Sequence, residues 1–412
     1  MFNIRYKSHH DVLNIINSSL GRGLSTNFTF EKVLNDKNNF RELGIYVHTP
    51  YCDKICSFCN MNRKQVDSSL DSYADYLCRE FEKYGKKLYP KEKHISTIFF
   101  GGGTPTIYKE KELEKILKAL RENFILTKDY EFTFETTLHN LTPKKIEILQ
   151  NYGVNRLSIG IQTFSNRGRK ILNRTYEKDE IIKRLKFLRE NFSGLICIDI
   201  IYNYPNETLE EIEEDAKILC ELNLDSCSFY SLMVQEGSKI SKLRKDNSNF
   251  YTYNLEKDKI LHDKFLEITL KNGYYLLEHT KITNGKDKYK YIKNVNNLDN
   301  LIPIGVGAGG RMENVECFHL NKLITFYGKD NIFKYSLKKI AGIMQYPQVS
   351  LKEIEEYSKE NFNIIFERLK EFQNKNLIIL EKEYFTYTLD GIFWGNSIIA
   401  DIINILIKIK NK

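Results

Sequence analysis

The chain has 412 residues, of which 42% are hydrophobic and 28% charged, and this composition is typical of a globular protein rather than a disordered one. A chain of this length favours two or three domains and can bury a large core without disulfides. The net charge of +8 comes from 62 basic residues spread along the chain against 54 acidic ones, which argues against nucleic-acid binding. Residues 1–10 contain no signal-peptide stretch and no run of 18 apolar residues occurs, so we expect a cytoplasmic protein without a membrane span.

Strand and helix patterns alternate between residues 44 and 235. Short β-branched or apolar runs predict strands, and stretches in which apolar residues recur every three to four positions predict helices. The predicted strands cover 44–48, 95–100, 130–136, 156–162, 195–201 and 225–234, and the predicted helices cover 70–84, 109–123, 180–190, 209–222 and a segment that begins at Thr142. Such units with short links imply parallel strands and right-handed crossovers. We therefore predict an α/β fold, a partial (β/α)6 barrel whose active site lies at the carboxyl ends of the strands.

The pattern changes after residue 236, where charged helical stretches, a glycine-rich turn at 305–310 and a final group of helices follow. Residues 377–389 are predicted to form a hairpin, and helices with a small hairpin resemble a winged-helix module. Residues 1–42 are predicted to form one helix and a lead-in. We predict an N-terminal extension (1–42), the barrel (43–236), a barrel extension that covers substrate (237–320) and a C-terminal winged-helix-like domain (321–412).

Three of the eight cysteines, Cys52, Cys56 and Cys59, lie within eight residues on the loop after the first predicted strand. In a reducing compartment such a group indicates metal or cofactor ligation more than disulfides. Thiolates bind iron–sulfur clusters, and three ligands for four irons leave one iron open to a small molecule. The alternatives are a zinc site, which usually needs a second cysteine pair, and simple burial of three thiols.

The cysteine loop and its flanks resemble the radical S-adenosylmethionine (SAM) superfamily. The segments YVHTPYC (46–52), GGGTPT (101–106), SIGIQTF (158–164) and IDIIYNYPNET (198–208) are similar, in order, to the oxygen-independent coproporphyrinogen oxidase-like family. The resemblance covers roughly residues 40–400. It implies a 4Fe–4S cluster on Cys52, Cys56 and Cys59, with SAM at the open iron. It also implies radical chemistry that starts when a flavodoxin- or ferredoxin-type partner supplies an electron.

The resemblance also implies the contacts to the cofactors. Glycine lets backbone approach a ligand closely, a guanidinium suits the SAM carboxylate, and an acid in an apolar strand needs a partner. A solvated strand end for Glu135 and a surface role for Arg174 are the plainer alternatives, as is support of the cysteine loop for Tyr46, which shares a strand face with His48. The implied cofactor-binding residues are Tyr46, Phe58, Gly102, Gly103, Thr104, Glu135, Gln162, Arg174 and Asp199.

Three activities compete within the family. Coproporphyrinogen oxidases carry a further cysteine where Met61 stands, and haem chaperones usually carry Gly-Ala-Gly-Ala-His where this chain has GAGGR (307–311). A glycine pair followed by a basic residue, together with the closing LDGIFW (389–394), resembles best the subgroup of anaerobic haem-degrading methyltransferases, which are anaerobilin synthase-like. We therefore expect an enzyme that acts on a tetrapyrrole, and the favoured activity is haem ring opening by radical methylation with release of iron. The haem chaperone and coproporphyrinogen oxidation are the alternatives.

Haem needs a ligand for its iron or an apolar slot with cations for its propionates. His279 and His319 are the candidate ligands, and Lys281 and Arg311 are the candidate cations. Each of these histidines is also compatible with an ordinary core or surface position.

Overall fold

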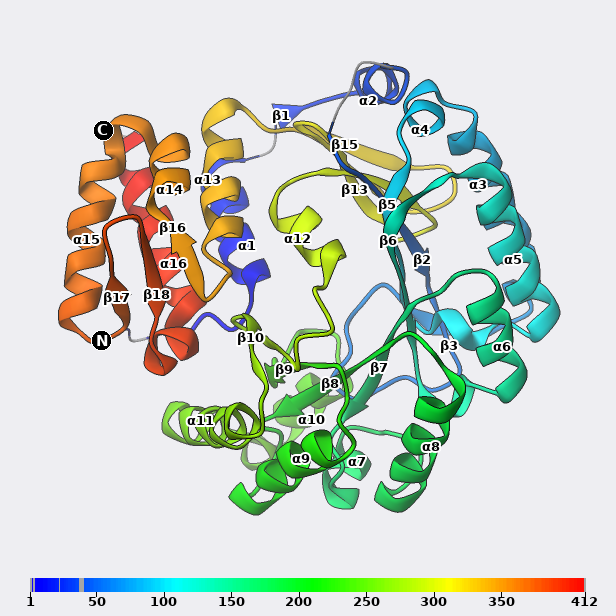
Figure 1. Cartoon of the computed structure of the whole chain (residues 1–412), viewed down its shortest axis with the longest axis horizontal. Coiled ribbons are helices and arrows are strands. Elements are labelled where there is room, and N and C mark those ends of the chain that lie inside the picture. Colours follow the sequence, from blue (N-terminus) through cyan, green and yellow to red (C-terminus); the bar gives the residue numbers. More distant parts are fainter. Residues whose placement is uncertain (1, 3, 22, 37–40, 411–412) are drawn as a thin grey trace.

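The computed structural model describes residues 2, 4–21, 23–36 and 41–410, and a thirteen-stranded mixed sheet forms its centre (Figure 1). The predicted strands lie side by side in chain order and run parallel. They are β2 (Leu43–Thr49), β5 (Ile95–Gly102), β6 (Leu126–Thr136), β7 (Arg156–Gln162), β8 (Leu195–Tyr202) and β9 (Ser226–Ser231). The structure therefore confirms the partial (β/α)6 barrel.

Amphipathic helices cover the outer face of these strands (Figure 1). In α5 (Glu110–Asn123) the buried residues Leu113, Ile116, Leu117 and Leu120 recur at helical spacing and face the sheet. Thr142 caps the next helix, because its hydroxyl accepts a hydrogen bond of 3.2 Å from the amide of Lys145. The other helices of this layer are α3 (Leu70–Gly85), α4 (Leu88–Glu92), α6 (Pro143–Asn151), α7 (Asn166–Ile171), α8 (Lys178–Asn191) and α9 (Leu209–Glu221).

The sheet continues at both edges with strands from residues 237–320 and beyond. β11 (Lys281–Thr283) and β10 (Tyr275–Glu278) add antiparallel to β9, whereas β12 (Asn300–Ile304) adds parallel to β2. Beyond β12 follow β13 (Gly309–Met312), β14 (Val315–His319), β15 (Thr325–Lys329) and β1 (Gly23–Leu24). The helices of this region are α10 (Lys239–Asp246), α11 (Leu255–Lys271) and α12 (Lys290–Asn296). The proposed domain boundaries thus fall inside one sheet, and they stay a prediction.

The C-terminal module combines four helices with a three-stranded antiparallel sheet, which includes the predicted hairpin. Its elements are α13 (Ile332–Ile343), β16 (Gln348–Ser350), α14 (Leu351–Ser358), α15 (Phe362–Asn374), β17 (Ile378–Leu380), β18 (Tyr384–Tyr387) and α16 (Leu389–Lys410). By length and composition α16 could cross a membrane. However, 72% of its apolar window is buried inside the structure, so it serves here as the core helix of the module.

The N-terminal segment holds two helices, α1 (His9–Leu20) and α2 (Asn27–Leu34), where the sequence predicted one. Helix α1 packs against α13 and α16 of the C-terminal module, which lie more than three hundred positions away in the sequence (Figure 1). Val12 and Ile16 of α1 are fully buried in that contact. The two ends of the chain are therefore joined beside the carboxyl ends of the barrel strands.

Candidate functional site

The cysteine loop begins where β2 ends. Cys52 lies in the two-residue strand β3 (Tyr51–Cys52), which pairs with β4 (Lys64–Gln65), and Cys56 and Cys59 lie on the loop between these strands. Cys52 is 7% exposed and the other two are half-buried. All three thiols line one cavity.

The segment after α7 fixes the shape of this loop. The Ser57 hydroxyl donates a hydrogen bond of 2.7 Å to the carbonyl of Ile171, and the Asn173 side chain donates one of 2.7 Å to the carbonyl of Ile55. Asn173 has φ of 56°, in the left-handed region that asparagine tolerates better than most residues. The loop therefore keeps its conformation through contacts from a distant part of the chain.

Two polar side chains contact the thiols directly. The Thr104 hydroxyl donates to Cys52 Sγ at 3.6 Å, and Arg174 Nη1 donates to Cys56 Sγ at 2.8 Å. Burial raises the pKa of the Cys52 thiol to about 11 and also raises the pKa of Cys59, so ligation would displace their protons.

The arrangement fits a cluster better than zinc. In the described ranges, no three Cys, His, Asp or Glu side chains gather around one point as the ligands of a single ion. A structural zinc ion requires four ligands that converge on it. A 4Fe–4S cluster instead takes each thiolate at a different iron, so three separated thiols on one loop suit it.

The glycine loop after β5 packs against the start of the cysteine loop. The amide of Gly103 donates to the carbonyl of Thr49 at 2.7 Å, and the amide of Gly102 donates to Glu135 Oε2 at 3.1 Å. A Cβ at Gly103 would lie 2.8 Å from the Thr49 oxygen and closer still to that of Tyr51, so no side chain fits. Gly102 has φ of 109°, which favours glycine. The glycines therefore leave backbone exposed at the cavity wall.

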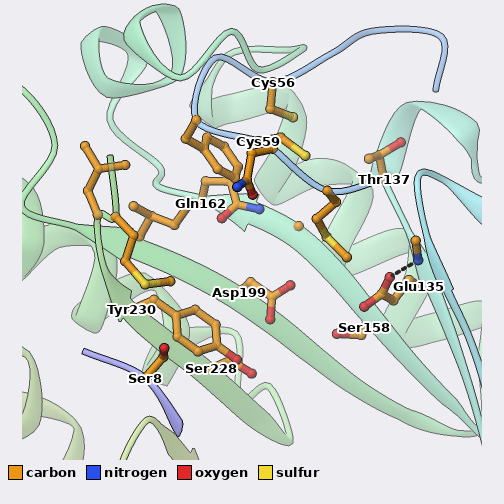
Figure 2. A pocket seen from close by; sticks show the side chains of 18 of the residues that line it. Ser8, Cys56, Cys59, Glu135, Thr137, Ser158, Gln162, Asp199, Ser228 and Tyr230 are labelled. Carbon is orange, nitrogen blue, oxygen red and sulfur yellow. Dashed lines mark hydrogen bonds between the residues drawn. The ribbon is translucent and has the colours of Figure 1, made fainter. Parts of the chain in front are cut away.

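The cavity has a volume of about 600 Å³ and lies at the carboxyl ends of the parallel strands. Figure 2 shows Cys56 and Cys59 on one side of it, Glu135 at the end of its strand and Ser8 on another side. Of the predicted cofactor-binding residues, all but Tyr46 line it, namely Phe58, Gly102, Gly103, Thr104, Glu135, Gln162, Arg174 and Asp199.

Tyr46 lies outside the cavity and supports its wall instead. Its hydroxyl is 2.9 Å from Nδ1 of the buried His48, whose Nε2 is 2.8 Å from the carbonyl oxygen of Asn62 beyond the cysteine loop. The Tyr46 ring stacks on Phe99, which does line the cavity. These contacts fit the plainer alternative of support for the cysteine loop, and the contact of Tyr46 with a cofactor stays a prediction.

The cavity holds buried polar groups that call for a charged, polar ligand. Burial and the nearby Asp199 raise the pKa of Glu135 to about 8, and burial raises the pKa of Asp199 as well. Among the described residues, Oε1 of Gln162 is buried without a hydrogen-bond partner, and so is Nε of Arg174. SAM would meet these needs, because its cationic groups suit the carboxylates and its carboxylate suits the guanidinium.

Lys281 and four polar residues form another part of the cavity wall. The sequence analysis did not single out these four, which are His9, His10, Tyr230 and Glu278. Lys281 Nζ lies 3.0 Å from Glu278 Oε1 and donates to the Tyr230 hydroxyl at 2.8 Å. His9 and His10, at the start of α1, complete this side. Only Lys281 had been predicted here. A helix at the very start of the chain carries no local sign of the cavity it reaches.

The other predicted haem-contacting groups do not reach the cavity. His279 is buried against Gly395 and the Tyr387 ring, with centroids 4.6 Å apart. His319 lies in β14, where its ring is bonded to Thr325 Oγ1 at 2.8 Å and to a backbone carbonyl. Arg311 pairs with Asp330 and others beside a second, smaller cavity. His319 and Arg311 are satisfied by these partners, whereas His279 is enclosed by packing with both ring nitrogens buried and without a hydrogen-bond partner among the described residues.

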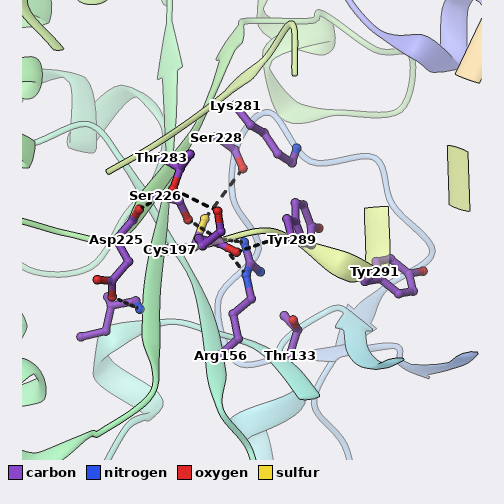
Figure 3. A network of polar contacts seen from close by, with 12 residues as sticks. Thr133, Arg156, Cys197, Asp225, Ser226, Ser228, Lys281, Thr283, Tyr289 and Tyr291 are labelled. Carbon is purple, nitrogen blue, oxygen red and sulfur yellow. Dashed lines mark hydrogen bonds and ion pairs between the residues drawn. The ribbon is translucent and has the colours of Figure 1, made fainter. Parts of the chain in front are cut away.

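A buried ion pair between Arg156 and Asp287 belongs to the polar network near Lys281 (Figure 3). Asp287 accepts hydrogen bonds from Arg156 Nε at 3.0 Å and Nη2 at 2.9 Å, and also from the Ser226 hydroxyl. Asp287 Oδ1 accepts a further bond of 2.8 Å from the amide of Tyr289, whose side chain lines the cavity. The pair thus ties the loop before α12 to strands β7 and β9.

The sequence profile of the Radical SAM superfamily matches residues 46–219, which contain the cysteine loop and the four strand ends beside it. Residues 46–219 thus form a radical SAM domain, and the chain is similar to proteins of the coproporphyrinogen oxidase-like family. Radical SAM proteins use a 4Fe–4S cluster and SAM, which agrees with the cofactors expected from the sequence.

Curated relatives of this radical SAM chain differ in how far they match. "Heme chaperone HemW" of Lactococcus lactis is 26% identical over 86% of this chain and 95% of its own length. "Anaerobilin synthase" of Escherichia coli O157:H7 is 28% identical over 52% of this chain and 48% of its own length. "Oxygen-independent coproporphyrinogen III oxidase" of Escherichia coli K12 is 33% identical over 46% of this chain and 42% of its own.

A solved structure shares the whole fold. Coproporphyrinogen III oxidase from Escherichia coli superimposes with a TM-score of 0.76 over 93% of both chains, at 20% sequence identity. The likeness therefore extends beyond the barrel to the added strands and the C-terminal helices.

Proposed function

We propose that this radical SAM protein binds haem in the main cavity and carries it, as a haem chaperone. The observation that carries this proposal is the extent of the matches. Heme chaperones match over 86% and 87% of this chain, whereas the anaerobilin synthase match covers 52%. The volume of about 600 Å³ lies within the range of small-molecule sites and supports a cofactor-sized cargo.

In this proposal Cys52, Cys56 and Cys59 hold the 4Fe–4S cluster. Once bound, the cluster and SAM supply one-electron cleavage of SAM, with the electron from a flavodoxin- or ferredoxin-type partner. Arg174 has a double role, since it donates to Cys56 Sγ and leaves Nε buried without a partner beside the cavity.

The remaining polar residues would orient SAM. Glu135, fixed by the amide of Gly102, and Asp199 present carboxylates to its cationic groups. Gln162 turns its buried amide oxygen toward the same space, and Gly103 keeps the backbone accessible. The buried surroundings exclude water from these contacts.

Haem ring opening by radical methylation is the second candidate, and one observation favours it. The cysteine loop and the Lys281 side line a single continuous cavity, so a cargo would lie next to the place where SAM is cleaved. The glycine turn with Arg311 and the closing LDGIFW (389–394) also resemble the haem-degrading subgroup.

One anaerobic experiment separates these functions. The cluster is reconstituted, haem, SAM and a strong reductant are added, and the haem bands are followed together with 5′-deoxyadenosine and S-adenosylhomocysteine. A chaperone retains the haem bands and passes the haem to an apo-haem protein. Loss of the bands with formation of both SAM products would establish ring opening instead, and absence of haem binding would reject both functions. Asp199→Ala should weaken SAM binding and leave haem binding intact, so an equal loss of both would indicate misfolding.

A further inference from the structure

Residues 5–7 anchor the chain immediately before His9 and His10 through an ion pair and hydrogen bonds to distant segments. Arg5 forms a buried ion pair with Asp258 and donates to the Tyr202 hydroxyl at 3.0 Å. Lys7 Nζ donates to the carbonyl of Leu232 at 2.8 Å, and the amide of Tyr6 donates to Ser397 Oγ at 3.0 Å. These bonds join residues 5–7 to β8, α11 and α16 immediately before the two histidines.

Helix α1 then begins in a fixed orientation. Asp11 Oδ2 accepts the amide of Ser8 at 3.0 Å and the amide of Lys7 at 2.9 Å, which closes the first turn. The following turns pack against α13 and α16 through the buried Val12 and Ile16, and the first turn places His9 and His10 in the cavity lining. The position of both rings is therefore determined by the fold.

The two imidazoles lie against each other with their planes tilted by 36° and are not otherwise engaged. Their ring centroids lie 4.0 Å apart, and no hydrogen bond or ion pair to either ring is found within the described part of the chain. His9 is half-buried and His10 is more exposed, although both line the main cavity. Both also line a second cavity of about 230 Å³, so the pair lies where the two cavities meet.

The other histidines cannot serve the same purpose. Of the eight in the chain, His139 is the remaining one that lines the main cavity, and its Nε2 is 2.5 Å from Asp53 Oδ2 beside the cysteine loop. His48, His262, His279 and His319 lie outside it, and His94 is exposed before β5. Burial lowers the pKa of both His9 and His10, which favours the neutral imidazole that binds iron.

We propose that His10 is the axial ligand to the iron of haem held in the main cavity, with the His9 ring packed beside it. The proposal rests on the proposed haem binding and adds the residue that would hold the iron. His10 is assigned as the ligand because its ring is the more exposed of the two and has no competing partner. Proximal histidine ligation is a common way for proteins to hold haem iron. The cluster cysteines, by contrast, belong to the opposite side of the cavity.

The test compares haem with metal-free protoporphyrin IX in the full chain, under anaerobic conditions and with the cluster reconstituted. His10→Ala should lower haem affinity about tenfold or more, remove the absorption bands of histidine-ligated haem and leave protoporphyrin IX affinity unchanged. His9→Ala should keep the ligated bands, and His94→Ala serves as the control for loss of an exposed histidine. Free imidazole should restore the bands in His10→Ala.

Each outcome bears on the proposal. Unchanged bands in His10→Ala would overturn the ligand assignment and leave haem binding itself standing. An equal loss of haem and protoporphyrin IX, with no rescue by imidazole, would give His10 a packing role and would also overturn the assignment. Failure of the unaltered protein to bind haem would reject the proposed function, and the ligand proposal with it.

Discussion

The cavity has two walls of very different origin. The strand-end wall is formed by the cysteine loop, the glycine loop and the ends of β6 to β8, all within residues 52–201. The far wall is assembled from four separate parts of the chain, and its residues are Ser8, His9, His10, Glu278, Lys281, Gln345 and Asn396. One wall is a series of local motifs, whereas the other exists only once the chain has folded.

The two walls carry side chains that suit different ligands. The strand-end wall carries thiols, glycines and carboxylates that suit a cluster and SAM, which are the cofactors of the superfamily. The far wall carries two adjacent imidazoles and a lysine paired with a glutamate, and these are groups that could recognise a metal-containing ligand. A family can keep the first wall and change its cargo by altering the second.

The largest effect should come from the strand-end wall. Cys56→Ala removes one of the three proposed cluster ligands and should abolish the iron–sulfur absorbance and SAM cleavage, because an open cluster with two thiolates is not held. The fold should persist, as judged by circular dichroism. Cys78→Ala, on α3 away from the cavity, is the matched control and should retain full absorbance. Retained iron–sulfur absorbance in Cys56→Ala would contradict the ligand assignment.

The second-largest effect should come from the buried ion pair that connects the two walls. Arg156 and Asp287 are a buried pair that links β7 to the loop carrying Tyr289. Asp287→Ala should lower the free energy of unfolding by about 3–5 kcal/mol, because it leaves a buried guanidinium without its partner. Urea denaturation measures this change.

A second ion pair, between β6 and the first residue of α12, provides the control. Asp129 is 79% exposed and lies 2.8 Å from Lys290 Nζ. Asp129→Ala should cost less than about 1 kcal/mol, as exposed pairs usually do. Equal losses of stability in Asp287→Ala and Asp129→Ala would show that the buried Arg156–Asp287 pair does not hold the two walls of the cavity together.

The strand-end wall could largely be predicted from sequence, since its signals are local. Apolar residues that recur every two or every 3.6 positions predict strands and helices, respectively, and the spacing of the three cysteines indicates metal or cofactor ligation. Thr142 was recognised as a helix start from Thr-Pro alone, and it does cap α6. The ends of successive parallel strands meet at one edge of a sheet, so these motifs had to meet there as well.

The far wall could not be predicted, because it depends on contacts between distant segments. Nothing in residues 1–10 indicates that Tyr6 will bond to Ser397 or that His10 will face a cavity. Residue type alone misplaced His279 and His319, whose surroundings are fixed by Gly395 and by Thr325. For Tyr46, alternation along β2 predicts which face the side chain is on but not that its ring stacks on Phe99.

The smallest effect tests the electrostatics of the strand-end wall. The pKa of Glu135, about 8, is above the ordinary value of 4.5. Between these values the folded chain binds more protons than the unfolded chain, so this group makes stability fall as pH rises from about 5 to 8. Glu135→Gln removes that dependence. In the absence of SAM, the variant should gain about 1–3 kcal/mol relative to the unaltered protein between pH 5 and 8.5.

The same substitution should act in the opposite direction on SAM binding. A cationic ligand favours the ionised carboxylate, so SAM affinity of the unaltered protein should rise with pH over this range, and the Gln variant should lose both affinity and slope. Urea denaturation and calorimetric titration at the two pH values measure the two effects. Glu122→Gln, at an exposed site on α5, is the control and should change neither. Parallel stability profiles for the unaltered protein and Glu135→Gln would show that this carboxyl is not held protonated by its surroundings, and the strand-end wall would then need no cation to complete it.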